Sequence, residues 1–156
     1  MTIFKQLVLA ALLLAWAGPA AALDMGTVDR VVTLMETIAE QSGEDIYYGA
    51  GDVFYELDFD GHIAAAGFSS TDWVAAFDEV VTGYMATIPQ DEFDAMFREV
   101  VAMLEASALS DEQKAELRQD MVLHIAEAQR ARESGMPHAE AVLPFAERLH
   151  PLFFGE

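Results

Sequence analysis

Apolar residues recur at helical spacing along most of this chain, and this periodicity constrains its fold more than any other feature. Between Gly26 and Gln41 the apolar positions are Val28, Val31, Val32, Met35, Ile38 and Ala39. Asp24 can cap the start of this segment, and Gly43 follows its end. A second stripe follows the capping sequence Ser69–Asp72 and consists of Trp73, Phe77, Val80, Val81 and Tyr84. Three- and four-residue spacing of this kind predicts amphipathic helices in both places.

Three further helices are predicted in the second half of the chain. Pro89 marks the start of the first, whose apolar stripe is Phe93, Met96, Phe97, Val100, Val101 and Leu104. The capping sequence Ser110–Gln113 opens the longest helix, which ends at Gly135. Its predicted buried face is Leu117, Met121, His124, Ile125 and Ala128. Pro137 starts a last helix, whose inward positions are Val142, Phe145, Ala146 and Leu149.

The sequence is compatible with two different secondary structures for residues 43–68. Partial alternation over residues 53–59 and the turn sequence Asp60-Gly61 favour a β-hairpin. The run from Ala64 to Gly67 is instead typical of a helix end, and a lone hairpin is only marginally stable. We therefore expect short helices here. The predicted fold is all-α, a single-domain bundle of five or six helices, with a short β-hairpin around residues 53–66 as the alternative.

Residues 1–22 have the layout of a cleavable signal peptide. Lys5 precedes an uncharged run from Leu7 to Ala17, and three small residues end at Ala22. The alternative is an uncleaved anchor helix, although the apolar stretch is short for one. Cleavage after Ala22 would leave residues 23–156 as a single helical domain in the periplasm or outside the cell.

The mature chain is strongly acidic and contains no cysteine. Without Lys5, 27 acidic residues stand against seven basic ones, which gives a net charge of −20. This charge repels nucleic acids and anionic lipids, so we expect neither nucleic-acid binding nor stable membrane insertion after cleavage. Because the sequence has no cysteine, the domain must be held together by its hydrophobic core.

One segment imitates the middle of a calcium-binding loop. Glu56, Asp58 and Asp60 offer oxygen ligands at alternate positions, and Gly61 follows as in an EF-hand. Gly67 stands where the bidentate glutamate of such a loop is needed. A solvated acidic turn is the alternative interpretation.

Two other patterns place imidazole near a thioether or a carboxylate. A methionine near a histidine suits copper, whereas Glu-x-x-His is the spacing found in di-iron bundles. Methionine and histidine on an apolar stripe are also ordinary core residues, and the second di-iron motif is missing. The residues concerned are Met121, His124, Met136, His138, Glu147 and His150. We expect no resident cofactor.

The sequence contains no nucleophile elbow and no glycine-rich phosphate loop. The leading hypothesis is therefore a periplasmic binding or accessory protein that docks another protein. Candidate contacts are the apolar tail and a pair of loop aromatics, namely Leu152, Phe153, Phe154, Tyr47 and Tyr48. The alternative is a metal-handling protein or an enzyme that uses the core of the helix bundle.

The segment Leu109–Lys114, which opens the longest predicted helix, resembles the Leu-Thr-x-x-Gln motif of periplasmic stress chaperones of the Spy type. In that family the motif occurs twice, whereas this chain has one copy, with Ser110 in place of threonine. A helix cap accounts for the same letters. The resemblance implies a holdase chaperone as a third possible function.

Overall fold

The computed structural model describes residues 23–42 and 51–154, and within these ranges the chain is all-helical. The elements are α2 (Met25–Ser42), α3 (Gly51–Leu57), α4 (His62–Ala65), α5 (Ser70–Thr87), α6 (Gln90–Ala106), α7 (Asp111–Gly135), α8 (Ala139–Val142), the 3-10 helix η1 (Leu143–Phe145) and α9 (Ala146–Phe154). The all-α prediction is confirmed, but the helices outnumber the expected five or six. The alternative of a β-hairpin at residues 53–66 is wrong, because α3 and α4 occupy this segment.

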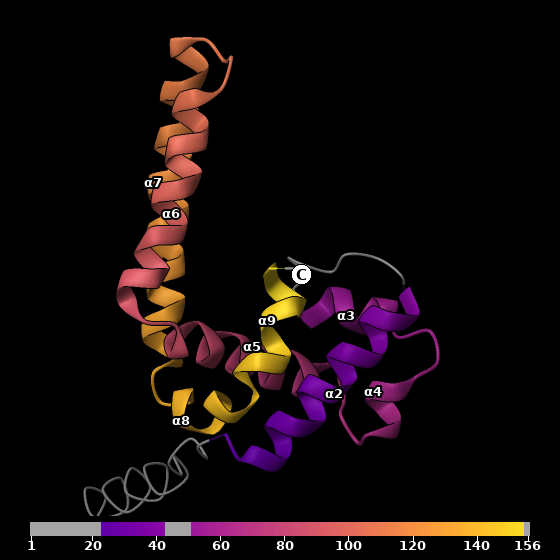
Figure 1. Ribbon diagram of the computed structural model, residues 1–156. Helices are drawn as coiled ribbons and strands as arrows, with labels where there is room; N and C mark the ends of the chain where they lie inside the picture. Colours follow the sequence, from indigo (N-terminus) through magenta and orange to yellow (C-terminus); the bar gives the residue numbers. More distant parts are fainter. Residues whose placement is uncertain (1–22, 43–50, 155–156) are drawn as a thin grey trace, which may run out of the picture.

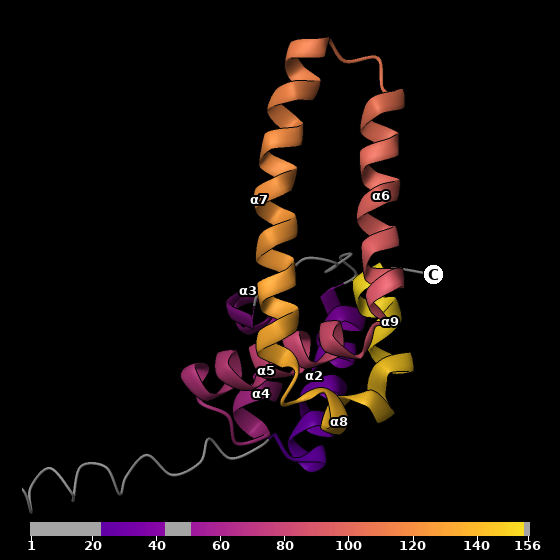
Figure 2. The same ribbon diagram turned by 90° about the vertical axis from the view of Figure 1, so that its left-hand side faces the viewer.

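The helices form a compact body and one projecting arm (Figures 1 and 2). The body consists of α2, α3, α4, α5, α8, η1 and α9, with α5 passing through its middle (Figure 1). The arm, residues 90–135, is the antiparallel pair α6 and α7, which rises from one end of α5 (Figure 2). The C-terminal end of α7 returns to the body and packs against α5. The concave corner between arm and body is where the candidate site lies.

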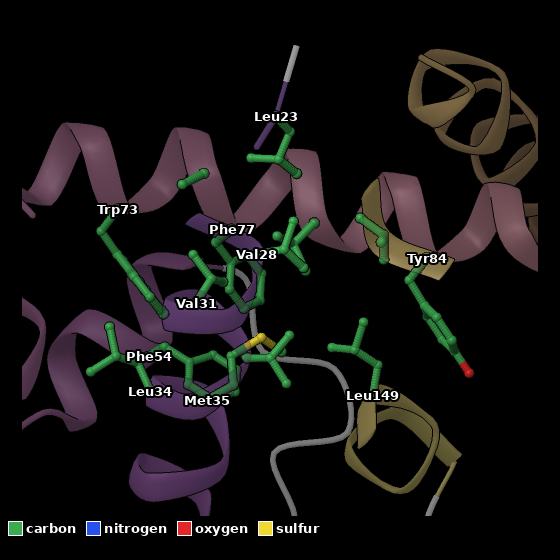
Figure 3. Close-up of a cluster of buried hydrophobic side chains, with 14 of the residues drawn as sticks. Leu23, Val28, Val31, Leu34, Met35, Phe54, Trp73, Phe77, Tyr84 and Leu149 are labelled. Carbon is green, nitrogen blue, oxygen red and sulfur yellow. The ribbon is translucent and has the colours of Figure 1, made fainter. Parts of the chain in front are cut away.

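The core of the body lies between α2 and α5 (Figure 3). Trp73 and Phe77 of α5 are buried, and so is Phe54 of α3. The Phe54 and Phe77 rings lie 5.2 Å apart, and the Trp73 indole N–H donates a hydrogen bond of 2.7 Å to the Gly51 carbonyl oxygen. Fully burying one large apolar side chain contributes about 1.5–3 kcal/mol. The predicted stripes of α2 and α5 thus form the main core.

Side-chain caps fix three helix starts as the sequence predicts. Asp24 accepts the backbone N–H of Thr27 at 3.0 Å, and Ser69 accepts that of Asp72 at 3.2 Å. Ser110 and Gln113 form a reciprocal capping box, with N–H···O distances of 3.3 and 3.0 Å. Such caps contribute about 1 kcal/mol each and set where a helix begins.

The predicted buried face of α7 is wrong, and most of the α6 stripe is not buried either. In the α6 stripe Phe93 alone is buried, and in α7 Leu117 is 42% exposed and His124 is exposed. No residue in the described stretch from Asp94 to Ser134 is buried. The reason is that the arm leaves the body, so the two helices have only each other to pack against beyond its base.

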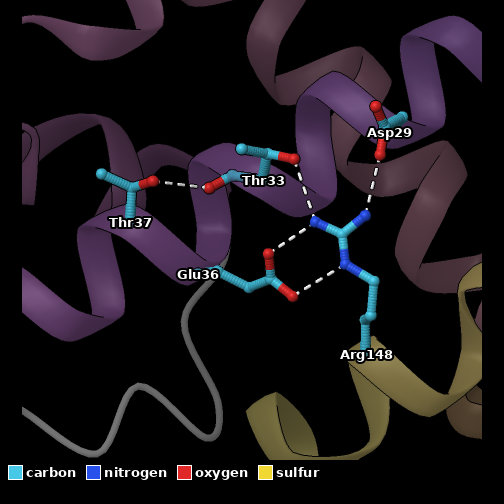
Figure 4. A network of polar contacts seen from close by, with 5 residues as sticks. All are labelled: Asp29, Thr33, Glu36, Thr37 and Arg148. Carbon is cyan, nitrogen blue, oxygen red and sulfur yellow. Dashed lines mark hydrogen bonds and ion pairs between the residues drawn. The ribbon is translucent and has the colours of Figure 1, made fainter.

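Arg148 of α9 ties the C-terminal helix to α2 through a polar network (Figure 4). Its guanidinium donates to both carboxylate oxygens of Glu36, at 2.9 and 2.6 Å, and to Asp29 at 2.8 Å. Thr33 accepts a further hydrogen bond of 2.9 Å. A bidentate pairing of this kind fixes the orientation of a helix as well as its distance.

Residues 1–22 lie outside the described residues, so the signal peptide and the extent of the mature domain stay predictions. Among the described helices, none has the length and apolar character required to cross a membrane.

Candidate docking groove

An apolar groove lies in the concave corner where the arm meets the body. It has a volume of about 300 Å³ and is enclosed by α5, α6 and the C-terminal end of α9. Every wall is apolar or aromatic, and its residues are Val81, Tyr84, Met85, Ile88, Phe93, Met96, Phe97, Val100, Phe153 and Phe154. Most of these side chains are aromatic or methionine, and these residue types are enriched at protein interfaces.

The wall on the body side is a fixed aromatic stack. The Phe153 ring stacks on that of Tyr84 with centroids 5.3 Å apart and an interplanar angle of 17°. The Tyr84 hydroxyl shares a hydrogen bond of 3.0 Å with Nδ1 of His150. Burial raises the pKa of the Tyr84 phenol, because the charged phenolate would lose its hydration. Phe154 is the exposed lip of this wall, with 49% of its surface accessible.

The wall on the arm side is held at its base by contacts from both arm helices. The Phe93 and Phe97 rings pack edge to face with centroids 5.1 Å apart. Arg132 of α7 lies over the Phe93 ring at 5.7 Å and donates a hydrogen bond of 2.9 Å to the Ile88 carbonyl oxygen. These contacts join the end of α5 to α6 and α7 at the foot of the groove.

The apolar lining continues up the arm beyond the groove. Val100, which lines the groove, is 45% exposed, and Met103 one turn further along α6 is 64% exposed. Residues three and four apart are neighbours on a helix surface, so Met96, Val100 and Met103 form one stripe. We call the groove together with this stripe the docking surface.

Unpaired carboxylates border the docking surface along α6. Glu92 precedes Met96 by four residues and Glu99 precedes Met103 by four, so both lie beside the stripe. Both are exposed, and neither carboxylate has an ion pair within the described part of the chain. Most basic side chains on the arm instead donate hydrogen bonds within the chain, namely Lys114, Arg118, Arg130 and Arg132.

The calcium-loop candidates have a structural use in this fold. The two carboxylate oxygens of Asp58 accept the backbone N–H groups of His62 and Ile63, each at 2.8 Å. They therefore cap the start of α4 rather than pointing into a common site. Glu56 on α3 and Asp60 in the turn are exposed.

The other metal candidates are not brought together. Within residues 23–42 and 51–154, no group of three or more His, Asp or Glu side chains is arranged to hold a metal ion. Most of these candidates are exposed, and Met121 and His138 are half-buried. The candidates are spread over α7, the turn after it and α9, and they are Met121, His124, Met136, His138, Glu147 and His150. The metal-handling alternative gains no support from this arrangement.

The predicted apolar tail belongs to the site, but as a wall. Leu152 and Phe153 are half-buried against the core of the body, and Phe154 lies at the groove. The other interaction candidates, Tyr47 and Tyr48, lie outside the described residues. The sequence prediction placed most of the groove residues of α5 and α6 on apolar stripes and did not recognise them as a surface site. One available signal was the composition of α7, which has many charged residues and an incomplete apolar stripe.

Comparison with known proteins leaves the site to be interpreted from its own chemistry. No protein-family model, curated protein or solved structure matches the chain.

Proposed function

We propose that this chain is an exported accessory protein that binds a partner protein on the docking surface. The observation that carries the proposal is the open apolar groove, with an aromatic stack on one side and an exposed apolar stripe on the other. Interfaces are anchored by aromatic and aliphatic side chains that become fully desolvated on binding. The groove is an apolar pocket into which such side chains of a partner could insert.

The energetics of the arm support the same proposal. Its helices have no buried side chain from Asp94 to Ser134, whereas most of the stability of helices in proteins comes from the tertiary packing of an apolar face. Covering Val100 and Met103 would remove apolar surface from water at about 25 cal/mol per Å². A partner on this face would thus stabilise the arm while gaining affinity from it.

Position-specific photo-cross-linking in the native host tests the proposal. A photoreactive phenylalanine replaces Met103 on the docking surface or, as the control, Val122 on α7. These side chains are matched in exposure, at 64% and 66%. We expect one discrete cross-linked protein from position 103, lost when Val100→Glu is added, and none from position 122. Equal cross-linking at both positions, or at neither, would refute the proposal.

A holdase chaperone is the second candidate, and the open apolar face of the arm favours it. A chaperone would bind unfolded clients of many sequences through such a face. Purified protein should then suppress the aggregation of a denatured model client at equimolar ratio, and Val100→Glu should weaken the effect. A dedicated docking protein would leave the aggregation unchanged.

A further inference from the structure

We infer that the segment bound on the docking surface is a basic amphipathic α-helix of the partner protein. This inference rests on the proposed function and adds the chemistry of the occupant. Two independent features carry it, the length and shape of the apolar stripe and the sign of the charge beside it.

The stripe has the form of a helix-binding surface. Met96, Val100 and Met103 follow a helical ridge along α6, and the groove at its foot is enclosed by Phe153 and Phe154. The apolar lining of α6 from Phe93 to Met103 rises about 15 Å, which matches about three turns of a partner helix. Amphipathic helices bind such grooves through anchors spaced three, four and seven residues apart.

The charge beside the stripe selects a basic helix. Glu92 and Glu99 are exposed next to the anchor positions, and the ion pairs within the described residues involve neither of them. Lysine or arginine side chains flanking the apolar face of a partner helix would reach both carboxylates. The net charge of −19 for the whole chain extends the attraction to longer range and would accelerate association.

The same charges disfavour a second copy of this chain as the occupant. A second copy would bring its own Glu92 and Glu99 and its own large negative charge to the interface. Like charges placed side by side without pairing oppose association. Addition of salt would strengthen such a self-contact but weaken the contact with a basic helix, so the two occupants differ in the sign of their salt dependence.

Model peptides of defined charge test the inference on the purified protein. The probe is a helix of about 18 residues of leucine and lysine, with leucine at helical spacing, to match the length of α6. One control replaces every lysine by glutamate, and another replaces every leucine by glutamine. We expect the leucine–lysine peptide alone to bind, with an affinity that falls at least about threefold when salt is raised from about 50 to 200 mM, because salt screens the attraction between lysine and carboxylate.

Matched variants locate the binding. Val100→Glu should weaken binding at least about tenfold, while Val122→Glu on α7 should leave it within about twofold. The pair Glu92→Gln and Glu99→Gln should weaken it several-fold more than Glu40→Gln with Glu56→Gln, which removes the same charge from exposed positions on α2 and α3. Circular dichroism confirms that each variant is folded, and a photoreactive phenylalanine at position 103 provides a second measurement that does not depend on the charge change.

The outcomes separate this inference from the proposed function. Equal binding of the lysine and glutamate peptides, or equal effects of the two carboxylate pairs, would overturn the basic-helix inference. If position 103 then still cross-links a partner in the host, the proposed function stands although the basic-helix inference is wrong. Failure of both the peptide and the host cross-link would remove both proposals.

Discussion

Gly135 at the end of α7 lies directly against the backbone of Thr82 in α5. A Cβ atom at position 135 would overlap the Thr82 carbonyl oxygen and the Gly83 backbone nitrogen. Gly83 of α5 faces α8 instead, where an added Cβ atom would lie 2.9 Å from Cγ2 of Val142. The arm therefore joins the body where the backbone of α7 crosses that of α5, and this crossing needs a glycine at position 135.

Replacement of Gly135 by alanine should destabilise the protein, although alanine is the better helix former. The added methyl group meets backbone rather than a flexible side chain, so α7 would have to shift away from α5. Overpacking of this kind costs about 1–3 kcal/mol. Chemical denaturation measures the loss, with Ser134→Ala at an exposed neighbouring position as control. If Gly135→Ala is as stable as the wild type, α7 can move away from α5 without a measurable loss of stability.

The pairing of Arg148 with Glu36 should contribute measurably to the docking of α9 on α2. Hydrogen bonding to Glu36 raises the pKa of Arg148 above its usual value, so the guanidinium stays charged at any working pH. The side chains of Arg148 and Glu36 are about one-third exposed, at 36% and 38%. We therefore expect a coupling of about 1 kcal/mol rather than the larger value of a buried pair.

A double-mutant cycle with Arg148→Met and Glu36→Gln measures that coupling, and it should shrink at high salt. Arg130→Met is the control, because Arg130 donates to the Ala126 carbonyl oxygen of its own helix. A coupling of zero would mean that α9 is held by its apolar contacts alone. The groove wall formed by Phe153 would then be independent of this network.

The sequence was sufficient to locate helices wherever local signals are complete. Ser69 and Ser110 each accept a hydrogen bond from the backbone N–H of the residue three positions on, and α5 and α7 begin directly after them. Capping is decided within four residues, so it can be recognised without the tertiary structure. Burial of Val28, Trp73 and Phe77 was likewise predictable, because these stripes are long and their opposite faces are polar.

Burial in the arm was not predictable in the same way. The α6 stripe, with Phe97 and Val100, has the pattern of a core helix, and periodicity alone does not say whether a neighbouring helix covers it. The covering depends on the joint at Gly135 and on the direction in which α7 leaves the body. The candidate groove therefore needed the three-dimensional arrangement of α5, α6 and α9, although one of its wall residues, Phe153, was among the interaction candidates named from the sequence.

Asp58 should act as a helix cap and not as a calcium ligand. Asp58→Ala removes the acceptor for two backbone N–H groups at the start of α4, which should cost about 1 kcal/mol, and Asp58→Asn should cost less. Thermal unfolding with and without millimolar calcium measures both the stability lost in each variant and any stabilisation by calcium. Calcium should leave the melting temperature unchanged in the wild type and in both variants. A calcium-dependent increase lost in Asp58→Ala would contradict the cap assignment.

Stability should fall at alkaline pH because of Tyr84. Burial raises the pKa of its phenol in the folded state, so the unfolded chain ionises first, beginning near pH 10. The stabilisation is complete below that pH and is lost as the pH rises through the folded pKa. Tyr84→Phe should be less stable at pH 8, by about 1 kcal/mol for the lost hydrogen bond to His150, but should show a smaller alkaline loss.

Denaturation at pH 8, 10 and 11 compares the two proteins. Tyr55→Phe is the control, since Tyr55 lies exposed on α3, and this variant should keep the alkaline loss of the wild type. Parallel curves for the wild type and Tyr84→Phe would show that the phenol does not govern the alkaline transition. Such a result would also mean that the stacking of Phe153 on Tyr84 does not keep water from the phenol.

The arm should open before the body does. No residue from Asp94 to Ser134 is buried, whereas α5 contributes Trp73, Phe77 and Val80 to the core. Segments with few buried apolar contacts exchange their amide hydrogens through local opening, at a lower free energy than global unfolding. Hydrogen–deuterium exchange should therefore show fast exchange in the outer halves of α6 and α7 and slow exchange in α5.

A ligand on the docking surface should change this pattern in one place. The leucine–lysine peptide should slow exchange along α6 near Val100 and Met103, because their apolar surface becomes covered and opening of the helix then requires release of the peptide. The core segment of α5 around Trp73 should be unaffected. Protection of the arm equal to that of α5 in the free protein would mean that α6 and α7 stabilise each other without a partner. The proposal that a partner on the docking surface stabilises the arm would then fail.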